Sequence, residues 1–91
     1  RTEYAVRKRL QKEGFSNILR TAGSHGAADL VALKDGDVFF VQVKRVEKKA
    51  DEANLFRKLT ENFGMPPGNY KRMIVTYVKK DRDYTYRMVR G

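Results

Sequence analysis

A carboxylate, an amide and an ammonium group gather at one end of a predicted β-hairpin, and their types suit phosphodiester hydrolysis. Asp29 precedes Gln42-Val43-Lys44 by thirteen positions. A hard cation such as Mg²⁺ takes oxygen ligands, which the Asp29 carboxylate, the Gln42 side-chain carbonyl and the Val43 main-chain carbonyl can supply. Lys44 can orient an attacking water and offset the charge on the phosphorane. The alternative is an ordinary polar patch at a hairpin end.

The predicted hairpin fixes how these groups are placed. Asp35-Gly36 separates two apolar runs, and Asp-Gly is typical of a type I′ turn, which needs positive φ at both central residues. With these two residues as the loop, Asp29 lies opposite Gln42, and Lys44 shares the face of Gln42 because side chains alternate along a strand. Both hairpin faces are otherwise apolar, so we expect the sheet to be covered on both sides.

The remaining elements indicate one α/β domain over residues 1–91, since the sequence has no repeat and no linker. Apolar periodicity and Gly and Pro positions predict a helix, three strands, a second helix and two strands. The predicted ranges are 2–13, 15–21, 28–33 and 38–44, then 47–62, 70–78 and 84–89. This order implies a mixed central sheet flanked by helices.

Each predicted helix has an apolar side. In the first helix Val6 and Leu10 repeat at i, i+4, and Glu3 falls on the same side. A carboxylate that faces a core is costly unless it is paired or binds metal, although Glu3 also suits the positive end of the helix dipole. The apolar side of the second helix is predicted to be core rather than an interface between two copies, and it comprises Leu55, Phe56, Leu59 and Phe63.

The charge balance points to a polyanionic partner. The 91 residues include 20 Lys+Arg against 11 Asp+Glu, a net charge of +9 and a pI of about 10.0. Nucleic acid and an anionic membrane surface both fit this excess. The apolar face of the basic first helix is narrow, which argues against the membrane. Since no recognition helix is evident, we expect DNA shape and backbone to be read rather than sequence.

Two absences narrow the classes further. The chain has no cysteine, which excludes disulfides, thiolate catalysis and thiolate zinc sites. No apolar run approaches the roughly 20 residues of a membrane span, and none reads as a signal peptide. We expect a cytoplasmic protein, in the host cytoplasm if it is viral.

Three stretches together resemble the archaeal-type Holliday junction resolvases of the PD-(D/E)xK nuclease superfamily. They are Leu19-Arg20-Thr21-Ala22-Gly23-Ser24, Asp29-Leu30-Val31-Ala32 and Val41-Gln42-Val43-Lys44. The resemblance implies a restriction-endonuclease-like fold and a homodimer that cuts two opposed strands of four-way junction DNA. It further implies Mg²⁺, with Mn²⁺ as a substitute, no small-molecule cofactor, and a place in DNA recombination and repair.

The resemblance also assigns roles to residues. The implied catalytic set is Glu3, Ser24, Asp29, Gln42 and Lys44, and the implied metal ligands are Glu3, Asp29, Gln42 and Val43. Arg20 is implied to contact phosphate, and Ser24 to lie in a loop near the scissile phosphate. The full set predicted to bind nucleic acid is Arg20, Ser24, His25, Arg45, Lys48 and Lys49.

The chain departs from the family pattern at two positions. Family members usually carry Glu where this chain has Gln42, and many carry Arg where it has Tyr4. Glutamine can ligate through oxygen but brings no negative charge, which should weaken Mg²⁺ binding. Gln42 is either natural variation or an inactivating substitution. Two other readings stay open: a branched-DNA or flap nuclease of the same superfamily, and a junction-binding protein without turnover.

Overall fold

The fold follows the predicted order of elements. The computed structural model describes residues 2–21, 28–63 and 68–90, with residues 2 and 3 described by their backbone alone. The elements are α1 (Thr2–Lys12), β1 (Ser16–Arg20), β2 (Leu30–Lys34), β3 (Asp37–Val46), the 3₁₀ turn η1 (Lys49–Asp51), α2 (Glu52–Glu61), β4 (Lys71–Val78) and β5 (Asp83–Val89). These bounds lie within two residues of the predicted ranges except at the second helix, which was predicted from residue 47 and begins at Glu52 after the 3₁₀ turn η1.

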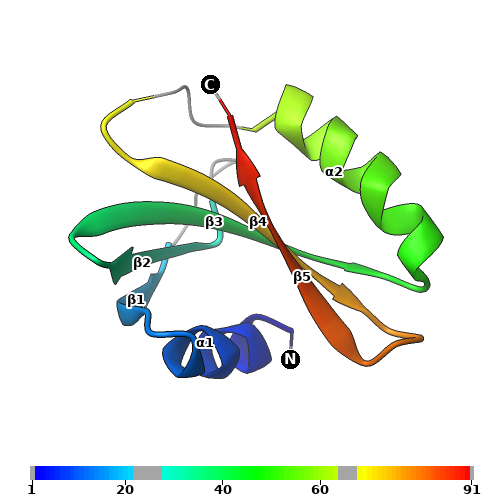
Figure 1. The fold of residues 1–91 in the computed structure, drawn as a ribbon, viewed down its shortest axis with the longest axis horizontal. Coiled ribbons are helices and arrows are strands. Elements are labelled where there is room, and N and C mark those ends of the chain that lie inside the picture. Colours follow the sequence, from blue (N-terminus) through cyan, green and yellow to red (C-terminus); the bar gives the residue numbers. More distant parts are fainter. Residues whose placement is uncertain (1, 22–27, 64–67, 91) are drawn as a thin grey trace.

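A five-stranded mixed sheet forms the centre of the molecule. The strands lie side by side in chain order, β1-β2-β3-β4-β5. β3 and β4 are parallel, and the other neighbours are antiparallel. A parallel pair needs a crossover, and the segment with η1 and α2 provides it between β3 and β4 (Figure 1). The predicted α/β fold with a mixed sheet and flanking helices is therefore confirmed.

The hairpin of β2 and β3 has the predicted turn and register. Asp35 and Gly36 have φ of 53° and 82°, the two positive values that a type I′ turn requires. The pairs run from Lys34 opposite Asp37 to Leu30 opposite Val41. The turn therefore sets which side chains of the two strands share a face.

One face of the sheet carries the main core beneath α1. Val6 and Leu10 of α1 are fully buried, as their spacing predicted. They pack with inward side chains of β1, β2, β3 and β4 and with Phe15, whose ring meets Phe39 edge to face at 4.9 Å. Tyr84 and Tyr86 of β5 pack against this cluster from its edge.

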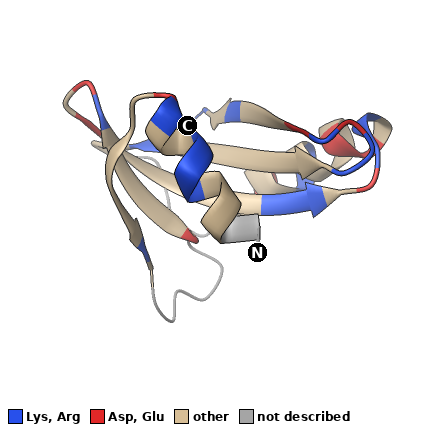
Figure 2. Cartoon of the chain, turned by 90° about the horizontal axis from the view of Figure 1, so that it is seen from below, with Lys and Arg blue, Asp and Glu red and all other residues tan. Residues whose placement is uncertain are grey.

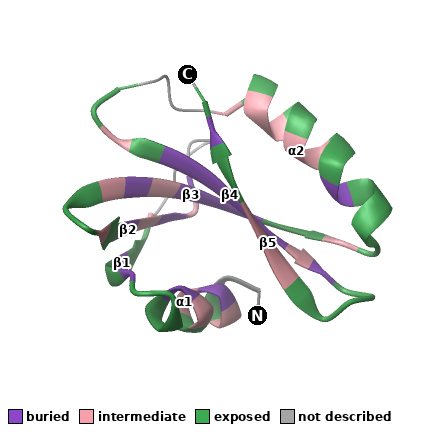
Figure 3. Cartoon of the chain, viewed as in Figure 1, coloured by how far each residue is buried: buried purple, intermediate pink, exposed green. Residues whose placement is uncertain are grey.

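The second face is covered by α2 only in part. Ile74, Thr76 and Val78 of β4 are buried there, whereas Leu33 is 37% and Leu19 64% exposed. The apolar residues of α2 predicted as core are of intermediate burial, and Glu52 is the buried residue of this helix (Figure 3). The prediction that both faces are covered is thus confirmed for α1 and only partly for α2.

Neither helix can cross a membrane. α1 has 11 residues and α2 has 10, and within the described ranges no helix is long and apolar enough for a span. The cytoplasmic location stays a prediction.

Candidate active site

Asp29 lies at the start of β2, where the strand bends out of regular pairing. The last regular pair is Leu30 with Val41, and the Asp29 N–H donates to the Val41 carbonyl at 2.8 Å. The predicted position directly opposite Gln42 is therefore not kept. Instead the Asp29 carboxylate Oδ2 accepts the N–H of Val43 at 2.8 Å. A contact between side chain and backbone thus joins Asp29 to the Gln42-Val43-Lys44 segment.

The same contact indicates where the Val43 carbonyl points. In an antiparallel ladder, the N–H and C=O of one residue face the same neighbouring strand. Since the Val43 N–H is directed at Asp29, its carbonyl is also on the β2 side, beyond the last regular pair. Oδ1 of Asp29 makes no hydrogen bond or ion pair with the described residues. Two oxygens of different residues therefore lie on the same side of β3.

Gln42 and Lys44 lie on the face of the sheet that carries α2. In register Gln42 is beside Ile74, and Lys44 is beside Thr76. Gln42 is 7% exposed, whereas Lys44 is exposed and makes no ion pair with any residue of the described ranges. The ammonium group of Lys44 is therefore available to an anionic substrate next to a buried amide.

The oxygen donors of the site fit a hard divalent cation, although of Asp29, Gln42 and Val43 only the Asp29 carboxylate carries a negative charge. Asp29 offers a carboxylate oxygen, Gln42 an amide oxygen and Val43 a carbonyl oxygen, the ligand types that Mg²⁺ prefers. Within the described ranges, no group of three or more His, Cys, Asp or Glu forms a metal cluster. Glu3 belongs to the first turn of α1, and its side chain lies outside the described residues. One carboxylate with neutral oxygens suits weak binding in which water completes the shell.

The end of β1 lies beside Asp29. The Thr21 N–H donates to the Asp29 carbonyl at 3.0 Å, and the Thr21 hydroxyl donates to the carbonyl of Ala28. Arg20 is exposed and pairs with Leu30, whose side chain is in the core beneath α1. By register, Arg20 is thus on the opposite face from Gln42. Ser24 and His25, the other two predicted contacts in this region, lie outside the described residues.

The predicted basic contacts after Lys44 are all exposed. Arg45 follows Lys44 on the other face of β3, with its guanidinium 6.0 Å from the ring centroid of Tyr77. Lys48 and Lys49 flank the start of η1, and neither makes an ion pair among the residues described. Figure 2 shows Lys and Arg at the end of β3 and along α1, which faces the viewer. The basic residues thus extend over both faces of this end of the sheet.

An ion pair between α2 and β5, in which the carboxylate is buried, was not predicted. Glu52 is 2% exposed, and its two carboxylate oxygens contact Arg87 at 2.8 Å (Nε to Oε2) and 3.0 Å (Nη2 to Oε1). Thr85 donates its hydroxyl to Oε2 at 3.2 Å, and the Arg87 guanidinium lies 5.0 Å from the Phe56 ring centroid. These contacts hold α2 on the face that carries Gln42 and Lys44.

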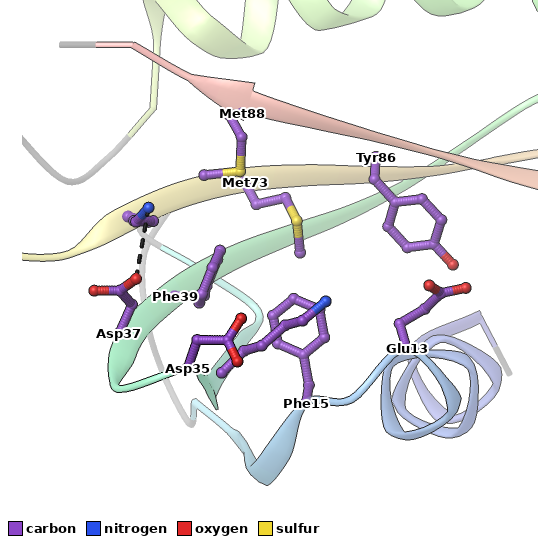
Figure 4. A pocket seen from close by; sticks show the side chains of 10 residues that line it. Glu13, Phe15, Asp35, Asp37, Phe39, Met73, Tyr86 and Met88 are labelled. Atoms are coloured by element: carbon purple, nitrogen blue, oxygen red, sulfur yellow. Dashed lines mark ion pairs between the residues drawn. The ribbon is translucent and has the colours of Figure 1, made fainter.

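A cavity of about 410 Å³ opens on the α1 side of the sheet, near the hairpin turn. Phe15, Phe39 and Met73 form apolar walls, and the ion pair of Lys71 with Asp37, 3.5 Å long, lies at the rim (Figure 4). Figure 4 shows the Tyr86 ring pointing into this space with its hydroxyl toward Glu13. Of the candidate catalytic side chains that the structure describes, neither Asp29 nor Gln42 nor Lys44 lines the cavity, so it is separate from the Asp29 site.

Comparison with known proteins places the fold. Neither a protein-family model nor a curated protein matches the chain. Among solved structures it is similar to Hjc of Archaeoglobus fulgidus, a Holliday junction resolvase from an archaeal hyperthermophile. The match has a TM-score of 0.63 and 20% identity, and it covers 97% of this chain and 74% of the other. The chain has the fold of an archaeal Holliday junction resolvase.

This resolvase fold confirms the architecture that the sequence resemblance implied. The match extends over both helices and all five strands, although the quoted motifs cover the first half only. At 20% identity the likeness establishes the fold and leaves the activity to the residues of the site.

Proposed function

We propose that the chain is a structure-specific endodeoxyribonuclease that resolves four-way DNA junctions by Mg²⁺-dependent phosphodiester hydrolysis. One observation carries the proposal: Oδ2 of Asp29 is held at the Val43 N–H, one residue before the exposed Lys44. A carboxylate and a lysine at this point of a resolvase fold are the groups that such hydrolysis requires. The biological setting would be DNA recombination and repair.

The proposed chemistry divides between ligands and Lys44. Asp29, Gln42 and Val43 would hold the cation through oxygen, with Glu3 contributing from α1. When bound, Mg²⁺ supplies Lewis-acid polarisation of the phosphate and lowers the pKa of bound water. Lys44 positions the attacking water and offsets the negative charge that develops on the phosphorane. The Val43 N–H keeps the Asp29 carboxylate oriented toward this site.

The DNA partner is supported by charge. A net charge of +9 favours phosphate contacts, which dominate affinity for nucleic acid and make it depend on salt. Arg45, Lys48 and Lys49 continue the exposed basic surface from Lys44, and Arg20 stands beside Asp29 on the other face. Contacts on both faces suit a bent or branched duplex better than a single straight one.

Paired cuts require two active sites, so the proposed enzyme is a homodimer. One chain has one Asp29–Lys44 site, and opposed strands of a four-way junction need a site each. The apolar side of α2 is of intermediate burial rather than fully buried, and it is the surface proposed to pair with a second copy. The self-complementary interface would be formed by Leu55, Phe56 and Leu59 of α2 and by Phe63 just after the helix.

Gln42 supports a second candidate, a junction-binding protein with weak or no turnover. The residue is 7% exposed beside the Asp29 site and brings an amide where family members usually have a carboxylate. The loss of one negative charge lowers the attraction for a divalent cation. This candidate shares the fold and the DNA contacts of the first and differs in cleavage.

The deciding experiment is cleavage of an end-labelled four-way junction beside a linear duplex and a flap of the same sequence. Each substrate is incubated with Mg²⁺, Mn²⁺ or EDTA, using the wild-type chain, Gln42→Glu and Asp29→Asn. Symmetric cuts in the junction alone, absent with EDTA and with Asp29→Asn, are expected. Binding without cuts that Gln42→Glu restores would favour the second candidate, and equal cutting of all substrates would contradict junction specificity.

A further inference from the structure

The outer side of α1 presents an exposed stripe that the candidate active site does not use. Val6 and Leu10 face the sheet and are fully buried. Tyr4, Lys8 and Lys12, spaced by four residues, are exposed on the other side of the helix. Residues four apart on a helix are neighbours on one side, so these three form a continuous row, which we call the α1 stripe.

The basic residues of α1 fall into two groups. Arg7 donates from Nη2 to the Ile18 carbonyl at 3.3 Å, and Arg9 pairs with Glu13 at 3.6 Å and with Asp83 at 3.7 Å. Lys8 and Lys12, in contrast, make no ion pair with any carboxylate of the described residues. The charge of the α1 stripe is therefore not neutralised within this part of the chain, and it can attract an external anion.

Tyr4 adds an exposed aromatic ring to this charge. It is 60% exposed, although a ring of this size is more often covered in a folded domain. Its ring contact within the described ranges is the ammonium of Lys8, 5.4 Å from the centroid. A cation over one face leaves the other open, and aromatic rings beside basic residues are what single-stranded bases stack on.

The position of the stripe relates it to the proposed nuclease site. α1 packs against β1 and β3, and its first turn lies toward the end of the sheet where β3 finishes (Figure 1). Tyr4 directly follows Glu3, the predicted helix-one acid. At 1.5 Å per residue, Lys8 and Lys12 are spaced by about 6 Å along the axis, so one DNA strand can contact both.

We propose that the α1 stripe is a DNA contact surface, in which Tyr4 stacks on a base left unpaired near a branch point while Lys8 and Lys12 bind phosphates of the same strand. The DNA partner rests on the proposed function, whereas the location and the stacking contact are additional to it. Charge without internal carboxylate partners favours a polyanion over a protein surface, and the exposed ring favours unstacked bases over a fully paired duplex.

Binding in EDTA tests the stripe apart from cleavage. Fluorescence anisotropy compares a labelled four-way junction, a duplex and a single-stranded oligonucleotide. Tyr4→Ala is expected to weaken binding to the single strand and the junction about tenfold and binding to the duplex less. Tyr4→Phe, which keeps the ring, should bind as the wild type does. Removing Lys8 and Lys12 together should weaken every complex and lower the salt slope by about 2.

The matched control is Lys58→Ala, which removes one exposed ammonium from α2 on the other side of the sheet. It should leave binding within about twofold of the wild type. Circular dichroism checks that each variant folds. Unchanged binding by Tyr4→Ala, or an equal loss with Lys58→Ala, would overturn the stripe. If the wild-type chain binds DNA through the α1 stripe but never cuts it, the result contradicts the proposed nuclease activity and not the stripe. If the wild-type chain binds no DNA, the result contradicts both proposals.

Discussion

Oδ2 of Asp29 accepts the backbone N–H of Val43 at 2.8 Å, so the candidate carboxylate is positioned by the edge of a neighbouring strand. The bond spans 14 positions of the sequence and closes the open end of the β2–β3 hairpin. The other end of that hairpin is its type I′ turn, which sets the register of the two strands. The geometry of the site therefore depends on a turn that lies at the far end of the hairpin.

Gly36→Ala should weaken the fold modestly. Gly36 has φ of 82°, a conformation that strains any residue with a Cβ, while among the described residues no atom outside the turn lies within 4 Å of the added methyl. The cost is therefore backbone strain alone, about 1 kcal/mol of unfolding free energy. Urea denaturation measures it. Gly36→Asn, which tolerates positive φ better, is the control and should lose less; a larger loss with Asn would contradict the strain argument.

Lys44→Ala should remove activity without removing stability. Lys44 is exposed and makes no ion pair with described residues, so little packing is lost. If its ammonium stabilises charge in the transition state, cleavage of the junction should slow by about 100-fold or more. Single-turnover rates measure the effect, and thermal unfolding should shift by no more than about 2 °C. Lys80→Ala, at an exposed site in the turn between β4 and β5, is the charge-matched control and should retain cleavage.

Gln42→Glu should strengthen binding of the divalent cation. The new carboxylate would lie beside the Val43 backbone that holds Asp29, so two negative charges would replace one. The Mg²⁺ concentration that gives half-maximal cleavage should fall several-fold, and Mn²⁺ titration by calorimetry should show tighter binding. A Gln42→Leu variant, which removes the oxygen, should move both in the opposite direction. Equal metal dependence in all three chains would exclude residue 42 as a ligand.

The sequence predicted the hairpin well because its determinants are local. The Asp35-Gly36 turn and the alternation of side chains fixed the register from Lys34 to Leu30, as observed. The bend at Asp29 depends on hydrogen bonds to Val41 and Thr21, which no local pattern reveals. The prediction therefore placed Asp29 correctly beside the Gln42-Val43-Lys44 segment, but its position directly opposite Gln42 was wrong.

Arg20 shows a second limit of sequence analysis. The register of β1 against β2 shifts between Ser16 and Leu19, and Asn17 has φ of 50° at this irregularity. An irregularity of this kind changes which face the following side chains occupy. The sequence motif therefore placed Arg20 near Asp29, but it did not indicate on which face of the sheet the Arg20 side chain lies.

Glu52 did leave a signal in the sequence. It precedes Leu55, Phe56 and Leu59 by three, four and seven positions, the spacing of one helix side. A charge on an apolar side indicates a buried partner, but that partner is Arg87, 35 positions further along the chain. Only the pairing of β4 with β5 brings the two together, and no local pattern contains it.

Tyr86→Phe should leave stability at pH 7 unchanged or slightly higher. The Tyr86 hydroxyl is buried and has no hydrogen-bond partner in the described part of the chain, so its removal relieves a desolvated group. The pKa of Tyr86 is raised above its usual value, chiefly by burial. Arg9 lowers this pKa to a smaller extent, and Glu13, Tyr84 and Asp83 raise it slightly. A loss above about 1 kcal/mol at pH 7 would indicate a hydrogen bond and contradict this reading.

The raised pKa of Tyr86 also predicts that the folded chain loses stability at alkaline pH. In the unfolded chain Tyr86 ionises near pH 10, whereas the folded state keeps it protonated to higher pH. Its contribution is thus fully present below about pH 10 and is lost as the pH rises through the folded pKa. Urea unfolding at pH 9 and 11 should show a smaller drop for Tyr86→Phe than for the wild type, and equal drops would count against the shift.

Arg87→Met should be the most destabilising of these changes. It leaves the Glu52 carboxylate, 2% exposed, with the Thr85 hydroxyl as its remaining described partner. Because Arg87 itself is 46% exposed, we expect a loss of about 3 kcal/mol, at the low end of values for a buried pair. For a domain of this size that lowers Tm by about 12 °C or more, measurable by calorimetry.

A double variant separates the unpaired charge from lost packing. Glu52→Leu combined with Arg87→Met removes both charges and keeps apolar volume between α2 and β5, so it should recover most of the stability. It should also retain junction binding, since neither residue belongs to the Asp29 site or the α1 stripe. Arg9→Met, which removes two exposed ion pairs, with Glu13 and with Asp83, is the control and should cost about 1 kcal/mol or less. If the double variant is no more stable than Arg87→Met, the loss comes from the packing of Arg87 on Phe56 rather than from the stranded carboxylate.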